Sequence, residues 1–109
     1  MNASTAWARA AGITYRQLDY WARMGYLRPT GNGRGSGYWR KWPYEERRIA
    51  VVMARLVNAG VAVPVSASAA REAVDRAGGA GGAVVVFIAR DVSVCVDVPV
   101  VDVEDVPSI

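Results

Sequence analysis

The side chains whose types and spacing could carry chemistry lie in one short amphipathic segment, residues 14–24. Its polar positions hold Arg16, Gln17, Asp19, Tyr20 and Arg23. The apolar positions recur three and four residues apart, which predicts a helix with a buried rear face made by Tyr15, Leu18, Trp21 and Ala22. In the major groove of B-DNA, Arg pairs with guanine and Gln with adenine through two hydrogen bonds. The segment therefore predicts a helix that presents base-reading side chains near its N-terminal end.

The ends of this helix are marked by capping residues. Thr14 followed three residues later by Gln17 is the pattern of a capping box, and Gly25 is a stop signal. A shorter helix is predicted before it, from Ser4 or Thr5 to about Ala10. Two short helices joined by the tight turn at 11–13 predict a helix-turn-helix.

The following segment predicts a β-hairpin, here called the wing. Two short strands, Tyr26–Pro29 and 38–42, flank a stretch in which every second residue from Gly31 to Gly37 is glycine. A basic hairpin beside a reading helix can follow the sugar-phosphate backbone or place an Arg in the minor groove. Trp39 and Trp42 point to opposite faces of the second strand, so we expect at least one of them in the core. The predicted nucleic-acid contacts of helix and wing are Thr14, Tyr15, Arg16, Gln17, Tyr20, Arg23, Arg34, Tyr38, Arg40 and Lys41.

Two further helices and a second hairpin are predicted in the rest of the chain. A strong helix runs from Tyr44 to Asn58, with an apolar stripe of Ile49, Val52, Met53, Leu56 and Val57. A weaker, Ala-rich helix runs from Pro64 or Ser66 to Ala77, with Val65, Ala69, Ala73 and Val74 as its expected buried side. Beyond the glycine run 78–82 the period changes to two, which predicts strands at 84–89 and 92–98. The last residues are expected to be an edge strand or a loose tail.

The expected fold class is α+β, a winged helix-turn-helix of four short helices with a β-hairpin wing, followed by a C-terminal β-hairpin. We expect residues 1–77 to form the DNA-binding domain and the glycine run 78–82 to act as a linker. Residues 83–109, the hairpin and an acidic tail, are the candidate oligomerisation element, because the valine face of the hairpin needs a partner. A homodimer or cooperative oligomer through this hairpin is the prediction.

The charge of the chain is divided between its halves. Residues 1–59 carry ten Arg and Lys and three acids, a net charge of +7, whereas residues 60–109 carry three Arg and seven acids, a net charge of −4. A basic first half is what a polyanionic partner requires, and a merely solvated Arg-rich surface is the alternative. The charge division therefore favours a nucleic-acid partner.

Several functional classes are excluded or disfavoured by composition. The absence of His excludes His-based triads, His metal ligands and His switches. The single Cys95 excludes an internal disulfide, indicates a reducing compartment and is best interpreted as a structural thiol. The glycines at 31–37 lack the Gly-Lys-Ser/Thr of a phosphate loop, and Glu45 and Glu46 suit the first turn of a helix. We expect no catalytic activity, metal or cofactor. No secretory signal or membrane span is visible, so the expected location is the cytoplasm, at the nucleoid.

Residues 13–29 resemble the recognition segment of MerR-family regulators, especially the actinobacterial type with a Gln-Leu-Asp-Tyr-Trp core at 17–21. Residues 35–42 resemble the wing of that group, and residues 55–61 the helix and glycine turn that follow. The resemblance covers about residues 5–75 and implies a winged helix-turn-helix that binds double-stranded DNA. It departs from better-known members, in which a long coiled-coil helix follows this module, because here a glycine run and a hairpin stand in that place and the sequence has a single cysteine. Short relatives of this kind also occur in phages and mobile elements, including excisionases and repressors.

Three hypotheses for function follow. The favoured one is a sequence-specific DNA-binding protein that regulates or represses transcription. The second is an architectural or recombination-directing DNA binder of the excisionase type, which a DNA-bending assay would distinguish. The third is a protein-interaction module that docks a host factor, which the absence of DNA binding at low salt would favour.

Overall fold

The structure is a computed structural model that describes residues 6–31 and 40–100. Four helices come first: α1 (Ala6–Ala10), α2 (Tyr15–Arg23), α3 (Tyr44–Asn58) and α4 (Val63–Ala77). A short 3-10 helix, η2 (Gly78–Ala80), leads to the strands β1 (Gly82–Ala89) and β2 (Val92–Val98), which form one antiparallel hairpin. The predicted α+β class, with helices first and a hairpin at the C-terminal side, is confirmed.

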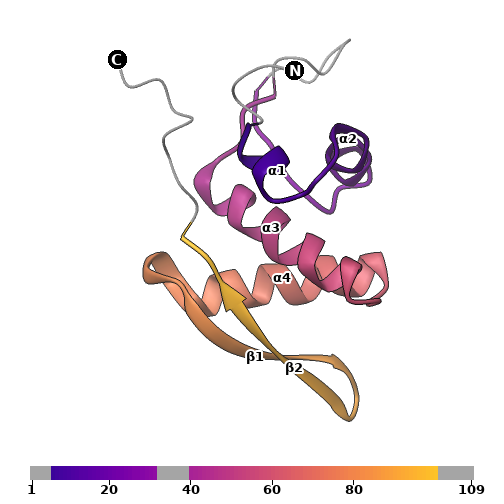
Figure 1. Ribbon diagram of the computed structural model, residues 1–109, viewed down its shortest axis with the longest axis vertical. Coiled ribbons are helices and arrows are strands. Elements are labelled where there is room, and N and C mark those ends of the chain that lie inside the picture. Colours follow the sequence, from indigo (N-terminus) through magenta and orange to yellow (C-terminus); the bar gives the residue numbers. More distant parts are fainter. Residues whose placement is uncertain (1–5, 32–39, 101–109) are drawn as a thin grey trace.

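The elements are stacked in layers on the two central helices. In Figure 1, α1 and α2 lie on one side of α3, and the hairpin lies on the far side of α4. The central helix α3 is buried on nearly every side, since all residues from Ile49 to Ala54 are buried. The predicted stripe of α3 lies in the core, although Val57 is only partly buried. Because α3 packs against α1, α4 and β2, it is the central element of the fold.

Small side chains allow α4 to pack closely between α3 and the hairpin. Its buried face consists of Ser66, Ala67, Ala69, Ala70, Ala73 and Val74. The prediction for Ala69, Ala73 and Val74 is confirmed, whereas Val65 is 37% exposed and the prediction that it is buried is wrong. Val65 lies in the first turn of α4, and the buried face of the helix begins with the next residues, Ser66 and Ala67.

The C-terminal hairpin packs one of its two faces on the helices. Val84 pairs with Val96 and Val86 with Val94 across the ladder. Val86, Val96 and Val98 are buried, and Val84, Ile88 and Val94 are partly buried against the same core. The valine face predicted to need a partner therefore has one inside the chain, in α4 and α3.

The glycine run before the hairpin is tightly structured at one point. Gly78–Ala80 forms η2, and Gly82 already belongs to β1. Gly81 has a φ of 75°, and a Cβ added there would lie 2.6 Å from the carbonyl oxygen of Val98. This position accepts only glycine without local rearrangement, because both the backbone conformation and the contact exclude a side chain.

Two arginines of α3 fasten β2 and the residue after it to the helical core. The Nε of the fully buried Arg48 donates to the carbonyl oxygen of Pro99 at 3.0 Å. The Nη1 of Arg55 donates to the carbonyl oxygen of Asp97 at 2.8 Å. The hairpin is thus joined to α3 by hydrogen bonds as well as by apolar packing on α4.

The wing is described only at its base. Thr30 and Lys41 form an isolated antiparallel bridge with reciprocal hydrogen bonds of 2.8 and 2.7 Å. The predicted strand Tyr26–Pro29 is wrong: the backbone N–H groups of Tyr26 and Leu27 donate to the carbonyl oxygen of Trp21, which makes this segment the closing turn of α2. The predicted contacts Arg34 and Tyr38 lie outside the described residues.

The tryptophan expected in the core is Trp42. It is 6% exposed, and its ring meets that of Trp7 edge-on, with centroids 5.7 Å apart. This contact ties α1 to the chain that returns from the wing. Among residues 6–31 and 40–100, no helix combines the length and the apolar character needed to cross a membrane.

Candidate nucleic-acid interface

The helix α2 begins at a complete capping box. The backbone N–H of Gln17 donates to Oγ1 of Thr14, and the backbone N–H of Thr14 donates to Oε1 of Gln17, both at 3.0 Å. These bonds satisfy two N–H groups that a helix start would otherwise leave without acceptors. The capping box predicted from sequence is confirmed, and it fixes where the exposed face of α2 begins.

The rear face of α2 anchors it on the core. Leu18 and Trp21 are 2% and 3% exposed, and Ala22 is partly buried. Tyr15 was expected on this face as well, but it is 49% exposed. It lies at the first position of α2, beyond the part of the helix that rests on the core. The turn between α1 and α2 is closed by buried Ile13, whose N–H donates to the carbonyl oxygen of Ala8 at 2.8 Å.

The front face of α2 presents a group of exposed polar side chains. Arg16 is exposed, Tyr20 is 52% exposed and the side chain of Arg23 is 70% exposed. Gln17 is partly buried because its amide oxygen is engaged in the capping box. The structure therefore places Arg16, Tyr20 and Arg23 on one exposed face of α2.

Asp19 links α2 to the base of the wing. Its Oδ1 accepts a hydrogen bond of 2.7 Å from Nη1 of Arg40, and its Oδ2 lies 3.1 Å from Nε of Arg23. Asp19 and Arg40 are largely shielded, with side chains 24% and 19% exposed. The neighbouring Lys41 is exposed. Of the two cations predicted at the wing base, Lys41 is exposed to solvent, whereas Arg40 is bound to Asp19 of α2.

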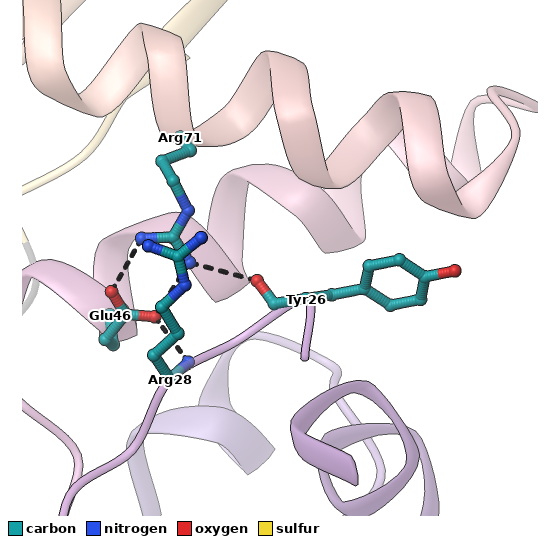
Figure 2. Close-up of polar contacts among 4 residues, drawn as sticks. All are labelled: Tyr26, Arg28, Glu46 and Arg71. Carbon is teal, nitrogen blue, oxygen red and sulfur yellow. Dashed lines mark hydrogen bonds and ion pairs between the residues drawn. The ribbon is translucent and has the colours of Figure 1, made fainter. Parts of the chain in front are cut away.

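A second polar cluster supports the turn that leaves α2, and sequence reasoning missed it. The guanidinium of Arg71, on α4, donates two hydrogen bonds, of 2.8 and 3.1 Å, to the carboxylate of Glu46, on α3 (Figure 2). The same guanidinium donates to the carbonyl oxygen of Tyr26 at 3.0 Å, and Glu46 accepts the backbone N–H of Arg28 at 2.8 Å. Both backbone groups lie in the segment between α2 and the wing, so the cluster fixes where that segment leaves the core.

The residue types and sequence positions of Glu46 and Arg71 do not predict this cluster. Glu46 was interpreted as a residue of the first helical turn, and it does lie there, but it is only 8% exposed. Its partner Arg71 is 25 positions away. An acid in a first turn is usually solvated, and only the tertiary arrangement shows that this one is buried. Within the described residues there is no group of three or more acidic or Cys side chains that could hold a metal ion.

The capped helix, its tight preceding turn and its exposed basic face define a helix-turn-helix module of the kind that binds DNA. The chain belongs to the MerR HTH family of regulatory proteins, whose family model matches residues 4–66. It is similar to proteins named as uncharacterised HTH-type transcriptional regulators from Mycobacterium bovis and Mycobacterium tuberculosis. Each is 39% identical over 54 residues, which cover 49% of this chain and 24% of the relative. No solved structure matches the chain.

Proposed function

We propose that this protein is a sequence-specific double-stranded DNA-binding protein that regulates transcription. The observation that carries the proposal is α2 itself, which is capped at Thr14 and anchored by Leu18 and Trp21. Its opposite face, with Arg16, Tyr20 and Arg23, is exposed. Family membership supports the same conclusion. A helix with this division of faces fits the major groove with its N-terminal residues against the base edges.

The residues of α2 divide into base readers and backbone contacts. Arg16 lies in the first turn and is exposed, so it is the residue we assign to guanine. The amide oxygen of Gln17 is engaged with Thr14, so Gln17 contributes its NH₂ as a donor rather than a two-bond contact with adenine. Thr14, Tyr15, Tyr20 and Arg23 are proposed contacts around that centre, with Tyr20 and Arg23 assigned to phosphates.

The wing supplies the backbone contacts beside α2. Lys41 is exposed and follows directly on the residue that Asp19 holds, so we assign it to a phosphate. Arg40 contributes charge at the same place and also holds the base of the wing on α2. Arg34 and Tyr38 remain proposed contacts farther along the wing.

A single module of this size makes few base contacts, so tight selection requires more than one copy. We propose that the protein acts as a homodimer or cooperative oligomer through its C-terminal hairpin. In this proposal residues 1–77 bind DNA, residues 78–82 join the two parts, and residues 83–109 supply the contact between copies. A role on chromosomal DNA implies a location in the cytoplasm, at the nucleoid.

Selection of bound DNA from a random pool tests the proposal. We expect the wild-type protein to enrich a defined motif and Arg16→Ala to relax preference at one or two positions of it. Lys41→Ala is the matched control at the wing, and we expect it to weaken all sequences alike. Equal effects of the two variants would contradict the division of labour, and no binding even at low salt would contradict DNA binding itself.

A bending assay on the selected site completes the test. A regulator that reads bases through α2 is expected to prefer its selected site strongly, whether or not that site bends. A recombination-directing protein of the excisionase type bends DNA or coats it as a filament with little base preference. A strong bend with little base preference would contradict the proposed regulatory role.

A further inference from the structure

Arg48 is a fully buried cation whose two terminal nitrogens lack a hydrogen-bond acceptor. Its Nε donates to the carbonyl oxygen of Pro99 at 3.0 Å, and its Cζ lies 5.5 Å from the centre of the Tyr44 ring. Its Nη1 and Nη2 are buried, and neither donates a hydrogen bond to the residues that the structure describes. Because a guanidinium keeps its proton in a protein, a buried one requires a carboxylate or another anion beside it. The surroundings of Arg48 are therefore incomplete without an anionic partner.

Most acidic side chains of the chain are unable to supply this partner. The nearest is Glu45, whose Oε2 lies 3.8 Å from Nη1 of Arg48, beyond hydrogen-bond distance, and whose side chain is 59% exposed and thus mainly solvated. Asp97 lies on β2 between the buried residues Val96 and Val98, so its side chain points to the opposite face of the strand. Five further acids are bound to other arginines or lie on α4 and at the hairpin turn: Asp19, Glu46, Glu72, Asp75 and Asp91. The acids that remain are Asp102, Glu104 and Asp105.

These three acids belong to residues 101–109, here called the acidic segment, which has no basic residue and lies outside the described residues. The segment follows closely on Pro99, whose carbonyl oxygen Arg48 already holds. Asp102 is three residues from Pro99, about 10 Å at full extension, so its carboxylate is within reach of the guanidinium. We propose that the acidic segment folds back on α3 and that the carboxylate of Asp102 binds the Nη atoms of Arg48.

A carboxylate of the same chain is favoured over a free anion or a second copy. A group three residues from a fixed point is present at a high effective concentration, and closing so short a loop costs little conformational entropy. A free anion or a second copy has to be bound from solution. Arg48 is 0% exposed, so a partner from outside would also have to displace the chain around it.

An acidic segment anchored at Arg48 is close to the base of the wing. Arg48 is five residues from Pro43, the N-cap of α3, or about 7.5 Å along the helix axis. The strand of the wing that carries the exposed Lys41 ends directly before Pro43. Glu104 and Asp105 follow Asp102 by two and three residues, about 7 and 10 Å at full extension. Their carboxylates therefore reach the wing base.

The consequence is an autoinhibitory contact. Glu104 and Asp105 compete with DNA phosphates for the cations of the wing base, so the acidic segment lowers the affinity of the protein for DNA. This second step rests on the proposed function, whereas the contact between Asp102 and Arg48 does not. The hairpin itself stays available for the contact between copies.

Urea unfolding of the full chain tests the contact. Asp102→Asn leaves Arg48 buried without its counter-charge, so we expect the equilibrium constant of unfolding to rise about tenfold. Asp105→Asn is the matched control in the same segment, and Glu45→Gln tests the nearest other carboxylate. Each of these two should change the constant less than about twofold. A tenfold effect of Glu45→Gln, or equal effects of Asp102→Asn and Asp105→Asn, would overturn the proposal.

A double-mutant cycle assigns the contact to Arg48. In the background of Arg48→Met, the further change Asp102→Asn should alter the unfolding constant less than about twofold, because the buried charge is gone. Independent effects of the two substitutions would contradict the pair. If Arg48→Met does not fold, the comparison of Asp102→Asn with its two controls decides alone. The effect of Asp102→Asn should be the same at two protein concentrations tenfold apart. A dependence on concentration would indicate a carboxylate of a second copy and overturn the proposal.

DNA binding tests the autoinhibitory role. We expect Asp102→Asn and the double variant Glu104→Gln/Asp105→Asn each to bind DNA about three- to tenfold more tightly at low salt, with a smaller gain as salt screens the charges. Asp91→Asn/Asp97→Asn is the matched control for the double variant, since it removes two exposed acids from the hairpin, on the opposite side of α3 and α4 from α2 (Figure 1). Equal gains in the two double variants would mean that net charge alone matters and would overturn the role.

The two sets of measurements separate this inference from the proposed function. Unfolding contains no DNA, so it tests the contact whatever the protein binds. Selection of DNA by the wild-type protein without a gain in Glu104→Gln/Asp105→Asn overturns autoinhibition and leaves the proposed function intact. Failure of both the wild-type protein and this variant to bind any DNA contradicts the proposed function.

Discussion

Asp19 in the middle of the recognition helix holds Arg40 at the base of the wing, with 2.7 Å between Oδ1 and Nη1. The bond spans 21 positions of the chain and joins the two parts of the interface that contact DNA in our proposal. Asp19 also lies 3.1 Å from Nε of Arg23, so one carboxylate orients two cations. An acid at a surface that binds a polyanion opposes binding, and its contribution here is to position the wing.

The first prediction concerns Asp19→Asn. The substitution removes a negative charge near DNA and leaves Arg40 at most a neutral hydrogen bond in place of its ion pair, so we expect binding to random DNA at low salt to strengthen. Preference for the selected site should fall about five- to tenfold, roughly the 1–1.4 kcal/mol that one lost positioning contact is worth. Competition binding with selected and random duplexes measures both quantities.

Asp75→Asn is the matched control for that prediction. Asp75 is exposed on α4, and its loss changes the net charge equally. If Asp75→Asn lowers site preference as much as Asp19→Asn does, or if Asp19→Asn preserves it, the positioning role of Asp19 is wrong.

The features of the interface that the sequence predicts are local ones. The capping box of Thr14 and Gln17 and the stop at Gly25 depend on residues within one or two helical turns, and they occur as predicted. The pairing of the C-terminal strands was likewise readable, because alternation and a short turn define it. Local hydrogen bonds and periodicity suffice for such elements.

The features that the sequence did not predict are tertiary. Tyr26–Pro29 has the composition of a strand. The N–H groups of its first two residues nevertheless donate to the carbonyl oxygen of Trp21, near the end of α2. The valine face of the C-terminal hairpin was readable as apolar, but only packing shows that α4 covers it. Glu46 and Arg71 look like ordinary surface charges until α3 and α4 bring them together. The sequence pattern identifies an apolar face or a charged residue. It does not identify the element or the side chain that packs against it in the fold.

The second prediction concerns Lys41→Ala, a change at the exposed cation of the wing base. We expect weaker binding to all DNA sequences and a slope of log affinity against log salt smaller by about one, the value for one lost phosphate contact. Titrations at four salt concentrations measure the slope. An unchanged slope would show that Lys41 does not contact a phosphate.

The third prediction concerns the cluster below the turn between α2 and the wing. In Glu46→Gln, Arg71 keeps its bond to Tyr26 but loses the carboxylate that neutralises it, so we expect a loss of about 2 kcal/mol in the free energy of unfolding. This figure is below that of a fully buried pair because the side chain of Arg71 is 29% exposed. Urea unfolding followed by circular dichroism measures it.

Glu72→Gln is the control for Glu46→Gln. Glu72 pairs with Arg76 one turn along α4, and both side chains are about half exposed. Such a pair contributes less than about 0.5 kcal/mol. Similar losses in the two variants would mean that burial of Glu46 has no energetic consequence.

The fourth prediction concerns the connection between α4 and β1. Gly81 has φ 75° and ψ −165°, a conformation essentially restricted to glycine, and a Cβ there would meet the carbonyl oxygen of Val98. We therefore expect Gly81→Ala to lower the free energy of unfolding by about 2–3 kcal/mol. Gly79→Ala is the control, since nothing lies within 4 Å of the Cβ it would add. Because the strain pushes β2 away from β1, Gly81→Ala should also expose the buried valines to hydrogen exchange at β1 and β2. Equal stability of the two variants would mean that the hairpin is not held at this glycine.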